Sequence, residues 1–300
     1  MQNAGLAALG LNWRYLAFEV HPDDLRTAIA GAKAMKFIGL NLTVPHKLLA
    51  VDMVDVLDDS ARTWGAVNTI RFETRDSMGA WVPLHRVPPD EVGEIRSHGF
   101  NTDADALIRS IGEEFSWPPE GIRGASVLLL GAGGAARAAA IRLAQESVGA
   151  LHLANRTRDK AIAIAKEIVE RCPDFVIQPE GRSERVAAVE STQGRIHIVT
   201  GYSFDPVDIV INATSLGLRT DDKMPIDIEW LKSRRPKRVY DMIYRPAETP
   251  LLQLARQQGA KTANGLGMLL YQGAKALELW TEQTAPIAEM REALRKNVYG

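Results

Sequence analysis

The sequence predicts an α/β fold with two domains, the second of them a doubly wound parallel sheet of the Rossmann type. The first observation is the alternation of apolar strands and helical segments from residue 126 onward, which is typical of parallel sheets. The second is a glycine-rich turn that directly follows the apolar run 126–130. The third is a polar turn, Thr43–Lys47, at the end of an apolar strand in the first half of the chain.

Length and composition exclude several classes of protein. A chain of 300 residues is long enough for two domains. The formal net charge of -1 gives no reason to expect nucleic acid or an acidic membrane as a partner. The single cysteine, Cys172, excludes an internal disulfide framework and a cysteine-based zinc site, and we predict no metal. The chain shows no membrane-span or signal-peptide pattern, so we expect a cytoplasmic protein.

The first 103 residues read as the smaller α/β domain. Helical spacing of apolar residues predicts helices, and runs of large apolar or β-branched residues predict strands. We expect helices at 1–12, 22–35 and from the Thr43–Lys47 turn to about residue 58, and strands at 13–20, 36–42 and 66–73. The proline-containing stretch 75–98 reads as an inserted loop with room for a small hairpin.

The second domain is expected to begin with a linking helix at 104–114. Strands are predicted at 126–130, 150–154, 207–212 and 237–242, with a helix beginning near Gly134 after the first of them. Residues 173–206 are long for one connection, so we expect an extra strand or hairpin there. Amphipathic helices are predicted at 265–279 and 286–296.

The glycine-rich turn fits the dinucleotide-binding pattern G-x-G-x-x-A, with Gly131, Gly133 and Ala136 at its three small positions. The first glycine permits a tight turn, the second lets the backbone approach a pyrophosphate, and the small third residue lets helix and strand pack closely. The helix N-terminus then offers free N–H groups to the phosphates. Because the pattern lies between an apolar strand and an alanine-rich helix, we predict a dinucleotide cofactor.

The end of the next strand indicates which dinucleotide is bound. An NAD site usually has an acidic residue there to accept the ribose 2′-hydroxyl. This chain has Asn155-Arg156-Thr157, with Lys160 just beyond. An arginine accommodates a 2′-phosphate, and its planar fork matches phosphate geometry. We therefore predict NADP in preference to NAD, with a solvated basic turn as the alternative interpretation.

Three polar residues in separate motifs predict a site for a hydroxylated small molecule. Lys47 follows a strand end, Asn68 lies in Ala66-Val67-Asn68-Thr69, and Asp103 ends Asn101-Thr102-Asp103. A lysine held by a carboxylate can act as the general acid when a carbonyl becomes an alcohol. His46 is the alternative proton donor. The pattern favours an oxidoreductase that exchanges hydride between NADP and this substrate.

Eight motifs in order resemble those of the shikimate dehydrogenase family. They are Asn41–Lys47, Ala66–Thr69, Asn101–Asp103, Gly131–Ala135, Asn155–Thr157, Asn212–Ser215, Asp241–Tyr244 and Gly265–Gln272. The resemblance covers nearly the whole chain. It implies NADP-dependent reduction of 3-dehydroshikimate to shikimate, in the pathway to chorismate and the aromatic amino acids.

The resemblance also implies roles for individual residues and domains. Residues 1–103 would form the substrate-binding catalytic domain, joined by the C-terminal helices at 265–300, and residues 104–264 the NADP-binding domain. Lys47 and Asp103 match the catalytic pair, and Thr43, Asn68, Tyr244 and Gln272 match substrate-binding positions. The cofactor-binding positions are Gly131, Ala132, Gly133, Gly134, Ala135, Asn155, Arg156, Thr157, Lys160, Thr214, Gly265 and Met268.

Three departures from the family pattern stand in the sequence. The family's first strand and the Ser-rich loop after it are absent, so we expect weak binding of the substrate carboxylate and an active native form with upstream residues. Ala104 replaces a usual glycine, and the loop at 75–98 is longer than usual.

The alternatives left open are a quinate dehydrogenase that uses NAD, a catalytically weak or silent NADP-binding protein, and one part of a larger bifunctional enzyme. Beyond the small-molecule substrate we expect no nucleic-acid or membrane partner, and either a monomer or a homodimer.

Overall fold

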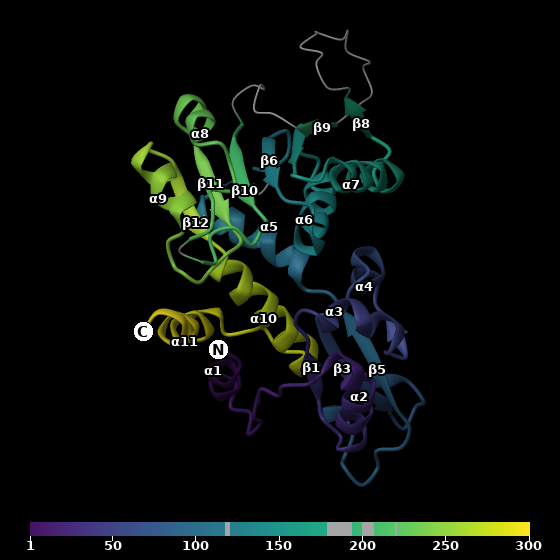
Figure 1. The fold of residues 1–300 in the computed structure, drawn as a ribbon. Coiled ribbons are helices and arrows are strands. Elements are labelled where there is room, and N and C mark those ends of the chain that lie inside the picture. The colour runs from purple at the N-terminus through teal and green to yellow at the C-terminus, as the bar shows by residue number, and fades with distance from the viewer. Residues whose placement is uncertain (118–120, 179–193, 200–206, 220) are drawn as a thin grey trace. The chain divides into compact units, whose positions relative to one another are not determined.

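The computed structural model describes residues 1–117, 121–178, 194–199, 207–219 and 221–300. The chain divides into two compact units (Figure 1). Unit 1 contains Met1–Asp103, Leu270–Val298 and Gly300, and unit 2 contains Ala104–Leu269 and Tyr299. The C-terminal helices α10 (Leu266–Thr281) and α11 (Ile287–Tyr299) therefore belong largely to unit 1.

Unit 1 is built from short strands and helices. Its helices before residue 103 are α1 (Gln2–Ala8), η1 (Pro22–Asp24), α2 (Leu25–Ala34), α3 (His46–Leu49), η2 (Ala50–Asp52), α4 (Asp59–Trp64) and η3 (Leu84–Arg86). Its strands are β1 (Gly39–Asn41), β2 (Val56–Leu57), β3 (Thr69–Arg75), β4 (Trp81–Pro83) and β5 (Ile95–Phe100). They form a mixed sheet with the order β1-β3-β5-β2, and β4 pairs with the free part of β3.

The two faces of strand β3 differ in polarity. Ile70 and Phe72 are fully buried on one face, in the same core cluster as Leu25 and Ile29 of α2. The residues at the alternate positions, Arg71 and Glu73, point to the opposite face, since side chains alternate along a strand. The apolar face therefore fixes the register of the sheet, and the polar face is held by charge and hydrogen bonds.

Unit 2 is a doubly wound sheet. Its helices are α5 (Asp103–Glu114), α6 (Gly134–Gln145), α7 (Arg158–Arg171), α8 (Ile228–Arg234) and α9 (Pro250–Gln257). Its strands are β6 (Ser126–Leu130), β7 (Ala150–Ala154), β8 (Phe175–Gln178), β9 (Gly194–Val199), β10 (Ile209–Asn212), β11 (Arg238–Asp241) and β12 (Lys261–Asn264). Among the described residues the strand order is β12-β11-β10-β6-β7-β9-β8, and every pair is parallel.

The core of unit 2 confirms the Rossmann-type fold class. Leu128 and Val210 of the central strands are fully buried in one cluster with Trp230 of α8 and Leu251 of α9. Chain order reverses at β6, which lies between β7 and β10 (Figure 1). In open α/β sheets, ligands bind beyond the carboxyl ends of the strands at such a switch point. The glycine-rich turn follows β6 at that end.

The strand predicted at 13–20 is wrong, because these residues form no regular element. Asn3 of α1 hydrogen-bonds both backbone groups of Tyr15, at 2.7 Å to its N–H and 2.9 Å to its carbonyl. Leu16 and Phe18 remain 65% and 64% exposed. Strand propensity reports how well a side chain fits a pleated, half-buried surface. It does not reveal whether a neighbouring strand is available, and the described part of the chain pairs β1 with β3 alone.

The helix predicted from the Thr43–Lys47 turn to residue 58 is too long. Helix α3 ends at Leu49, and β2 follows as a short strand parallel to β5. Asp55 and Ser97 exchange hydrogen bonds, with Asp55 N–H donating to Ser97 Oγ (2.9 Å) and Ser97 N–H to Asp55 Oδ2 (2.7 Å). These contacts attach the segment to β5 and end the helical path.

The stretch 75–98 contains more order than a loop. β3 and β4 form the hairpin for which the sequence left room, with Glu73 opposite Pro83. Strand β5 was missed, although it pairs with β3 from Thr74↔Ile95 to Thr69↔Phe100. Its sequence, Ile-Arg-Ser-His-Gly-Phe, has large apolar residues only at its two ends, and the four residues between them, which include Arg96 and His98, give no strand signal.

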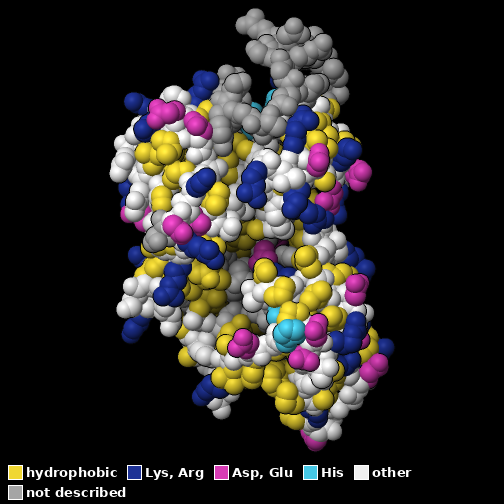
Figure 2. All heavy atoms as spheres, in the orientation of Figure 1, with side chains coloured by type: hydrophobic (Ala, Val, Ile, Leu, Met, Phe, Trp, Pro, Cys, Tyr) yellow, Lys and Arg dark blue, Asp and Glu magenta, His cyan; other side chains and the backbone are white. Residues whose placement is uncertain are grey.

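The other expected elements agree more closely with the structure. Strands β6 and β7, and the first residue of α6, coincide with the predicted bounds. Extra strands occur within 173–206, where β8 and β9 are parallel neighbours and not a hairpin; the rest of that stretch, 179–193 and 200–206, lies outside the described residues. None of the described helices is long and apolar enough to cross a membrane. On the face in Figure 2, acidic and basic side chains are intermingled.

Candidate active site

The polar motifs of unit 1 meet at one edge of its sheet. β1 and β5 are both antiparallel to β3, so their carboxyl ends lie where β3 begins. Lys47 follows β1 in α3, Asp103 follows β5 as the first residue of α5, and Asn68 immediately precedes β3. Three motifs that are far apart in the sequence are therefore adjacent in the fold.

Lys47 and Asp103 form a direct ion pair. Lys47 Nζ donates to Asp103 Oδ2 at 2.7 Å. The side chains are 25% and 20% exposed, so the pair is partly shielded from water but can still be reached by a small molecule. The main chain fixes the lysine as well, because Val67 N–H donates to the Lys47 carbonyl at 2.8 Å.

Asn68 organises the carboxylate side of this pair. The side chain of Asn68 is buried, and its Nδ2 lies 2.8 Å from Asp103 Oδ1 and 2.9 Å from Thr102 Oγ1. Its Oδ1 accepts from the Thr102 N–H at 3.0 Å and from Thr69 Oγ1 at 2.9 Å. Asp103 therefore receives one hydrogen bond on each oxygen, from Lys47 and from Asn68, which fixes the carboxylate plane.

Helix α10 contributes Gln272 to the same cluster. Asn68 Nδ2 lies 3.5 Å from Gln272 Oε1, and Thr102 Oγ1 donates to the Gln272 carbonyl at 3.0 Å. Gln272 is half-buried beside the pair. Of the substrate-binding residues predicted from the sequence, the structure thus brings Asn68 and Gln272 together with Lys47 and Asp103. Thr43 is exposed in the turn before α3.

His46 makes a structural contact. Its Nε2 lies 2.9 Å from the carbonyl oxygen of Val20. A carbonyl only accepts, so Nε2 carries the proton and donates it to the backbone. This bond occupies that ring nitrogen, which favours Lys47 over His46 as the proton donor.

The glycine-rich turn in unit 2 has the geometry of a dinucleotide cradle. Gly131 has a φ of +109°, and a Cβ there would lie 3.0 Å from the Ala213 carbonyl oxygen. Gly133 is the N-cap of the twelve-residue helix α6 and supplies no side-chain cap. A Cβ at Gly133 or Gly134 would meet nothing within 4 Å, so the space beside the helix N-terminus is open. Ala136 is fully buried, as close packing of helix and strand requires.

The basic residues after β7 are available for a phosphate. Arg156, Thr157 and Lys160 are exposed at the start of α7. Asn155 Nδ2 donates to the Thr157 carbonyl at 2.8 Å, which ties this turn together. An exposed guanidinium and ammonium beside the turn suit a doubly charged phosphate monoester.

A buried hydrogen-bond chain supports Thr214 next to the glycine turn. Asp241 Oδ2 accepts from Thr249 Oγ1 at 2.7 Å, and its Oδ1 accepts from Asn212 Nδ2 at 3.0 Å. Asn212 Oδ1 in turn accepts from Thr214 Oγ1 at 2.7 Å. Burial raises the pKa of the Asp241 carboxyl, and the hydrogen bonds from Thr249, Ile243 N–H and Asn212 oppose that rise.

The remaining predicted residues also lie in unit 2. Gly265 is buried where a Cβ would be 2.1 Å from the Met242 carbonyl oxygen, so only glycine fits. Met268 lies half-buried in the first turn of α10. Tyr244 is 38% exposed, and its carbonyl accepts from Tyr299 Oη at 2.7 Å. Tyr244 belongs to unit 2, whereas Thr43, Asn68 and Gln272 belong to unit 1.

Sequence reasoning missed two positioning residues, Thr102 and Asp241. Both lie in motifs that the sequence singled out, but their roles depend on contacts with partners 34 and 29 residues away along the chain. A polar residue in an otherwise apolar strand end, such as Asp241 after Arg238-Val239-Tyr240, is the signal that could have found one of them.

Three family models match the chain. Residues 1–70 match the shikimate dehydrogenase substrate binding domain, 117–177 the shikimate / quinate 5-dehydrogenase family, and 265–295 the shikimate 5'-dehydrogenase C-terminal domain. A shikimate dehydrogenase (NADP(+)) of Moorella thermoacetica is 39% identical over 298 residues, which cover 99% of this chain and 87% of that protein.

Solved structures agree. A shikimate dehydrogenase in complex with NADP+ superposes with a TM-score of 0.77 at 34% identity, covering 100% of this chain and 90% of that one. The Thermus thermophilus shikimate 5-dehydrogenase in complex with NADP(H) and shikimate has a TM-score of 0.75 at 27% identity, covering 98% of this chain and 92% of that one. The 5-ketofructose reductase of a Gluconobacter strain has a TM-score of 0.74 at 31% identity, covering 98% of this chain and 91% of that one.

A Rossmann-type unit with a basic turn after its second strand, together with a sheet that carries a lysine–carboxylate pair, defines an NADP-dependent oxidoreductase. The chain belongs to the shikimate dehydrogenase family. The predictions of family, fold class, oxidoreductase activity of the NADP-dependent shikimate dehydrogenase type and NADP as cofactor are confirmed. These matches do not support the expectation that a first strand and Ser-rich loop are missing; the stretch matched with the Moorella relative covers 99% of this chain and 87% of that protein.

Proposed function

We propose that this chain interconverts 3-dehydroshikimate and shikimate with NADP, and that Lys47 and Asp103 are its proton-transfer pair. The observation that carries the proposal is the 2.7 Å contact between Lys47 Nζ and Asp103 Oδ2, at an edge of the sheet where three polar motifs meet. Bound NADPH supplies the hydride that reduces the ring carbonyl. The residues described below bind, orient and protonate.

Lys47 is suited to be the general acid. As the substrate carbonyl becomes an alkoxide, an ammonium within hydrogen-bond distance can donate a proton to the oxygen. Asp103 holds the ammonium by one oxygen, and Asn68 holds the other oxygen of Asp103 at 2.8 Å. The carboxylate therefore keeps the lysine head in a single direction. In the reverse reaction the same pair accepts the proton of the alcohol.

Gln272 is suited to bind a substrate hydroxyl, because its half-buried amide can donate and accept and lies beside the ion pair. We assign Asn68 to the substrate on the family motif Ala66–Thr69; its buried side chain already bonds Thr69, Thr102 and Asp103. Thr43 supplies an exposed hydroxyl from the turn that also carries Lys47. We assign Tyr244 of unit 2 to the substrate as well, on the family motif Asp241–Tyr244 alone.

The residues of unit 2 fit NADP. The glycine turn Gly131–Ala135 leaves the α6 N-terminus open for the pyrophosphate, and Asn155, Arg156, Thr157 and Lys160 offer donors to the adenosine phosphate. Thr214 borders the turn, and we assign Gly265 and Met268 to the nicotinamide side on the family motif. We assign no metal to this chemistry. A cytoplasmic location and a monomeric or homodimeric state remain our proposals.

The decisive experiment is a matched set of steady-state assays. NADPH oxidation is followed with 3-dehydroshikimate, with dehydroquinate and with 5-ketofructose, and each assay is repeated with NADH. We expect the highest kcat/KM for 3-dehydroshikimate with NADPH. Faster turnover of dehydroquinate with NADH would favour the quinate alternative. Binding of NADPH without turnover of any of the three would contradict the assignment and favour a silent NADP-binding protein.

A further inference from the structure

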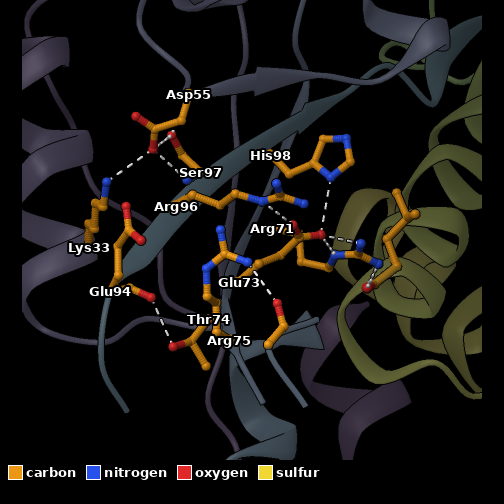
Figure 3. Close-up of polar contacts among 12 residues, drawn as sticks. Lys33, Asp55, Arg71, Glu73, Thr74, Arg75, Glu94, Arg96, Ser97 and His98 are labelled. Carbon is orange, nitrogen blue, oxygen red and sulfur yellow. Dashed lines mark hydrogen bonds and ion pairs between the residues drawn. The ribbon is translucent and has the colours of Figure 1, made fainter. Parts of the chain in front are cut away.

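The polar face of the unit 1 sheet holds a charged cluster outside the site described above (Figure 3). Glu73 on β3 is 1% exposed and lies among Arg71 on the same strand and Arg96 and His98 on β5. Arg96 Nε donates to Glu73 Oε2 at 2.7 Å, and His98 Nδ1 lies 3.1 Å from Glu73 Oε1. Arg71 contacts Glu73 Oε1 with both Nε and Nη2. One buried carboxylate thus orients two guanidinium groups.

Arg71 uses its third nitrogen outside the cluster. Its Nη1 donates to the carbonyl oxygen of Leu279 at 3.3 Å. Leu279 lies in the last turn of α10, where the final four carbonyls of a helix have no partner within it. Helix α10 has no basic residue of its own in that turn. Arg71 therefore brings from the sheet the positive charge that stabilises a helix C-terminus.

A second contact fastens the same end of α10. Trp280 Nε1 donates to the Ile70 carbonyl at 2.9 Å in a buried bond. A Cβ at Gly39 would lie 2.1 Å from Trp280 Nε1, so the indole packs directly on β1. At the site end of this part of the helix, Thr102 Oγ1 donates to the Gln272 carbonyl at 3.0 Å. The described contacts therefore hold α10 against the sheet at two separate places.

The spacing of these places connects the cluster to Gln272. Residues seven apart on an α-helix lie about 10 Å apart along the axis and about 20° apart around it. Gln272 and Leu279 are therefore on one stripe of α10. Two fastenings on one stripe fix the rotation of a helix about its axis, whereas one fastening lets it pivot. The rotation of α10 sets where the Gln272 amide points relative to Asn68 and Asp103.

We propose that Arg71 is a positioning residue for shikimate binding: held by Glu73, it fastens the C-terminal turn of α10 and so orients Gln272 toward the substrate. This inference rests on the proposed role of Gln272 in binding the substrate. Arg96 shares the same carboxylate but has no described contact with α10. Its guanidinium carbon lies 4.3 Å from the centroid of the Trp81 ring. The two arginines are thus a matched pair: both bind Glu73, but only Arg71 has a described contact with the Leu279 carbonyl of α10.

The test replaces each arginine by lysine. A lysine keeps the charge beside Glu73 but lacks the fork that reaches two partners at once. We expect Arg71→Lys to raise the KM for shikimate by about 3- to 10-fold while kcat stays within about twofold. Arg96→Lys should leave the KM and kcat unchanged, even if it lowers the melting temperature as much as Arg71→Lys does. Trp280→Phe, which removes the neighbouring fastening and keeps the cluster intact, should raise the KM in the same direction.

A double-mutant cycle separates this inference from the proposed function. If Arg71 acts through Gln272, Arg71→Lys should change the KM by less than about 1.5-fold in a Gln272→Ala background. Hydrogen exchange should also quicken at residues 276–281 in Arg71→Lys and not in Arg96→Lys. A Gln272→Ala enzyme with normal KM would remove the proposed role of Gln272, and the inference would fail with it.

Three results would overturn the inference while that role stands. One is an unchanged KM in Arg71→Lys although Gln272→Ala raises it. Another is an equal KM rise in Arg71→Lys and Arg96→Lys. The third is an equal KM rise from Arg71→Lys with and without Gln272.

Discussion

Lys47 and Asp103 are 56 residues apart in the chain, yet Lys47 Nζ lies 2.7 Å from Asp103 Oδ2. The contact exists because β1 and β5 run in the same direction on either side of β3, so the residues that follow them meet at one edge. Asn68, at the start of β3, completes the arrangement from the opposite strand direction. The topology of the sheet therefore assembles the proposed proton-transfer pair.

The first prediction concerns Lys47 as the general acid. Lys47→Ala should lower kcat by roughly 10²- to 10⁴-fold, the usual contribution of general acid–base catalysis. The dissociation constant for NADPH, measured by fluorescence titration, should barely change. Lys33→Ala, which removes an ion pair with Asp55 at 3.0 Å elsewhere in unit 1, is the control and should keep full kcat. A Lys47→Ala enzyme with near-normal kcat would refute the assignment.

The second prediction concerns cofactor choice. Arg156 should form charge-assisted hydrogen bonds with the 2′-phosphate, which are worth about 1.5–3 kcal/mol. Arg156→Ala should therefore raise the KM for NADPH by roughly 10- to 100-fold and leave NADH use almost unchanged. Lys232→Ala, which removes a surface pair with Glu229 on α8, controls for a general loss of positive charge. Equal losses with both cofactors would show that Arg156 supports the fold and not the phosphate.

The third prediction concerns the glycine turn. Gly131→Ala forces a side chain into a φ of +109° and places its Cβ 3.0 Å from the Ala213 carbonyl oxygen. We expect the free energy of unfolding to fall by about 1–3 kcal/mol and NADPH binding to weaken.

Gly259→Ala is the matched control for Gly131→Ala, because it has a φ of +86° but no atom within 4 Å of the new Cβ. It should destabilise the protein without changing the dissociation constant for NADPH. If both variants bind NADPH normally, the turn does not contact the cofactor.

The fourth prediction concerns acid stability. Burial raises the pKa of Glu73, but hydrogen bonds from His98, Arg71 and Arg96 outweigh burial and lower the pKa from 4.5 to about 2. A carboxylate with a depressed pKa in the folded state stabilises the protein above its unfolded-state pKa, and this contribution disappears as the pH falls through the folded value. The loss should therefore run from about pH 5 to pH 2 and amount to about 3 kcal/mol.

Chemical unfolding of wild type and Glu73→Gln between pH 7 and pH 2 tests this contribution. Glu73→Gln should be less stable at pH 7 and should show a smaller decrease as the pH falls. Asp59→Asn is the control, since Asp59 is fully exposed and lies 3.9 Å from Arg62. Parallel stability curves for wild type and Glu73→Gln would contradict the prediction.

The local signals in the sequence predicted the central strands of the parallel-sheet unit, but not its edge strand β12. β6, β7 and the start of α6 follow from an apolar run, a glycine turn and an alanine-rich helix, because each of these depends on neighbouring residues alone. NADP and the family follow from the same kind of local motif. The basic turn at Arg156 and the polar motifs around Lys47, Asn68 and Asp103 could be recognised residue by residue.

Tertiary structure decided what depends on distant partners. Residues 13–20 have the composition of a strand, yet Asn3 takes the place of a neighbouring strand at Tyr15. Strand β5 looks like a loop in the sequence, because Arg96 and His98 can occupy a buried face only when Glu73 lies opposite them. The contact of Arg71 with Leu279 joins residues 208 apart. Local propensity contains no information on such pairs, so the sequence alone determined the class of fold and the chemistry of the motifs, and long-range packing determined their geometry.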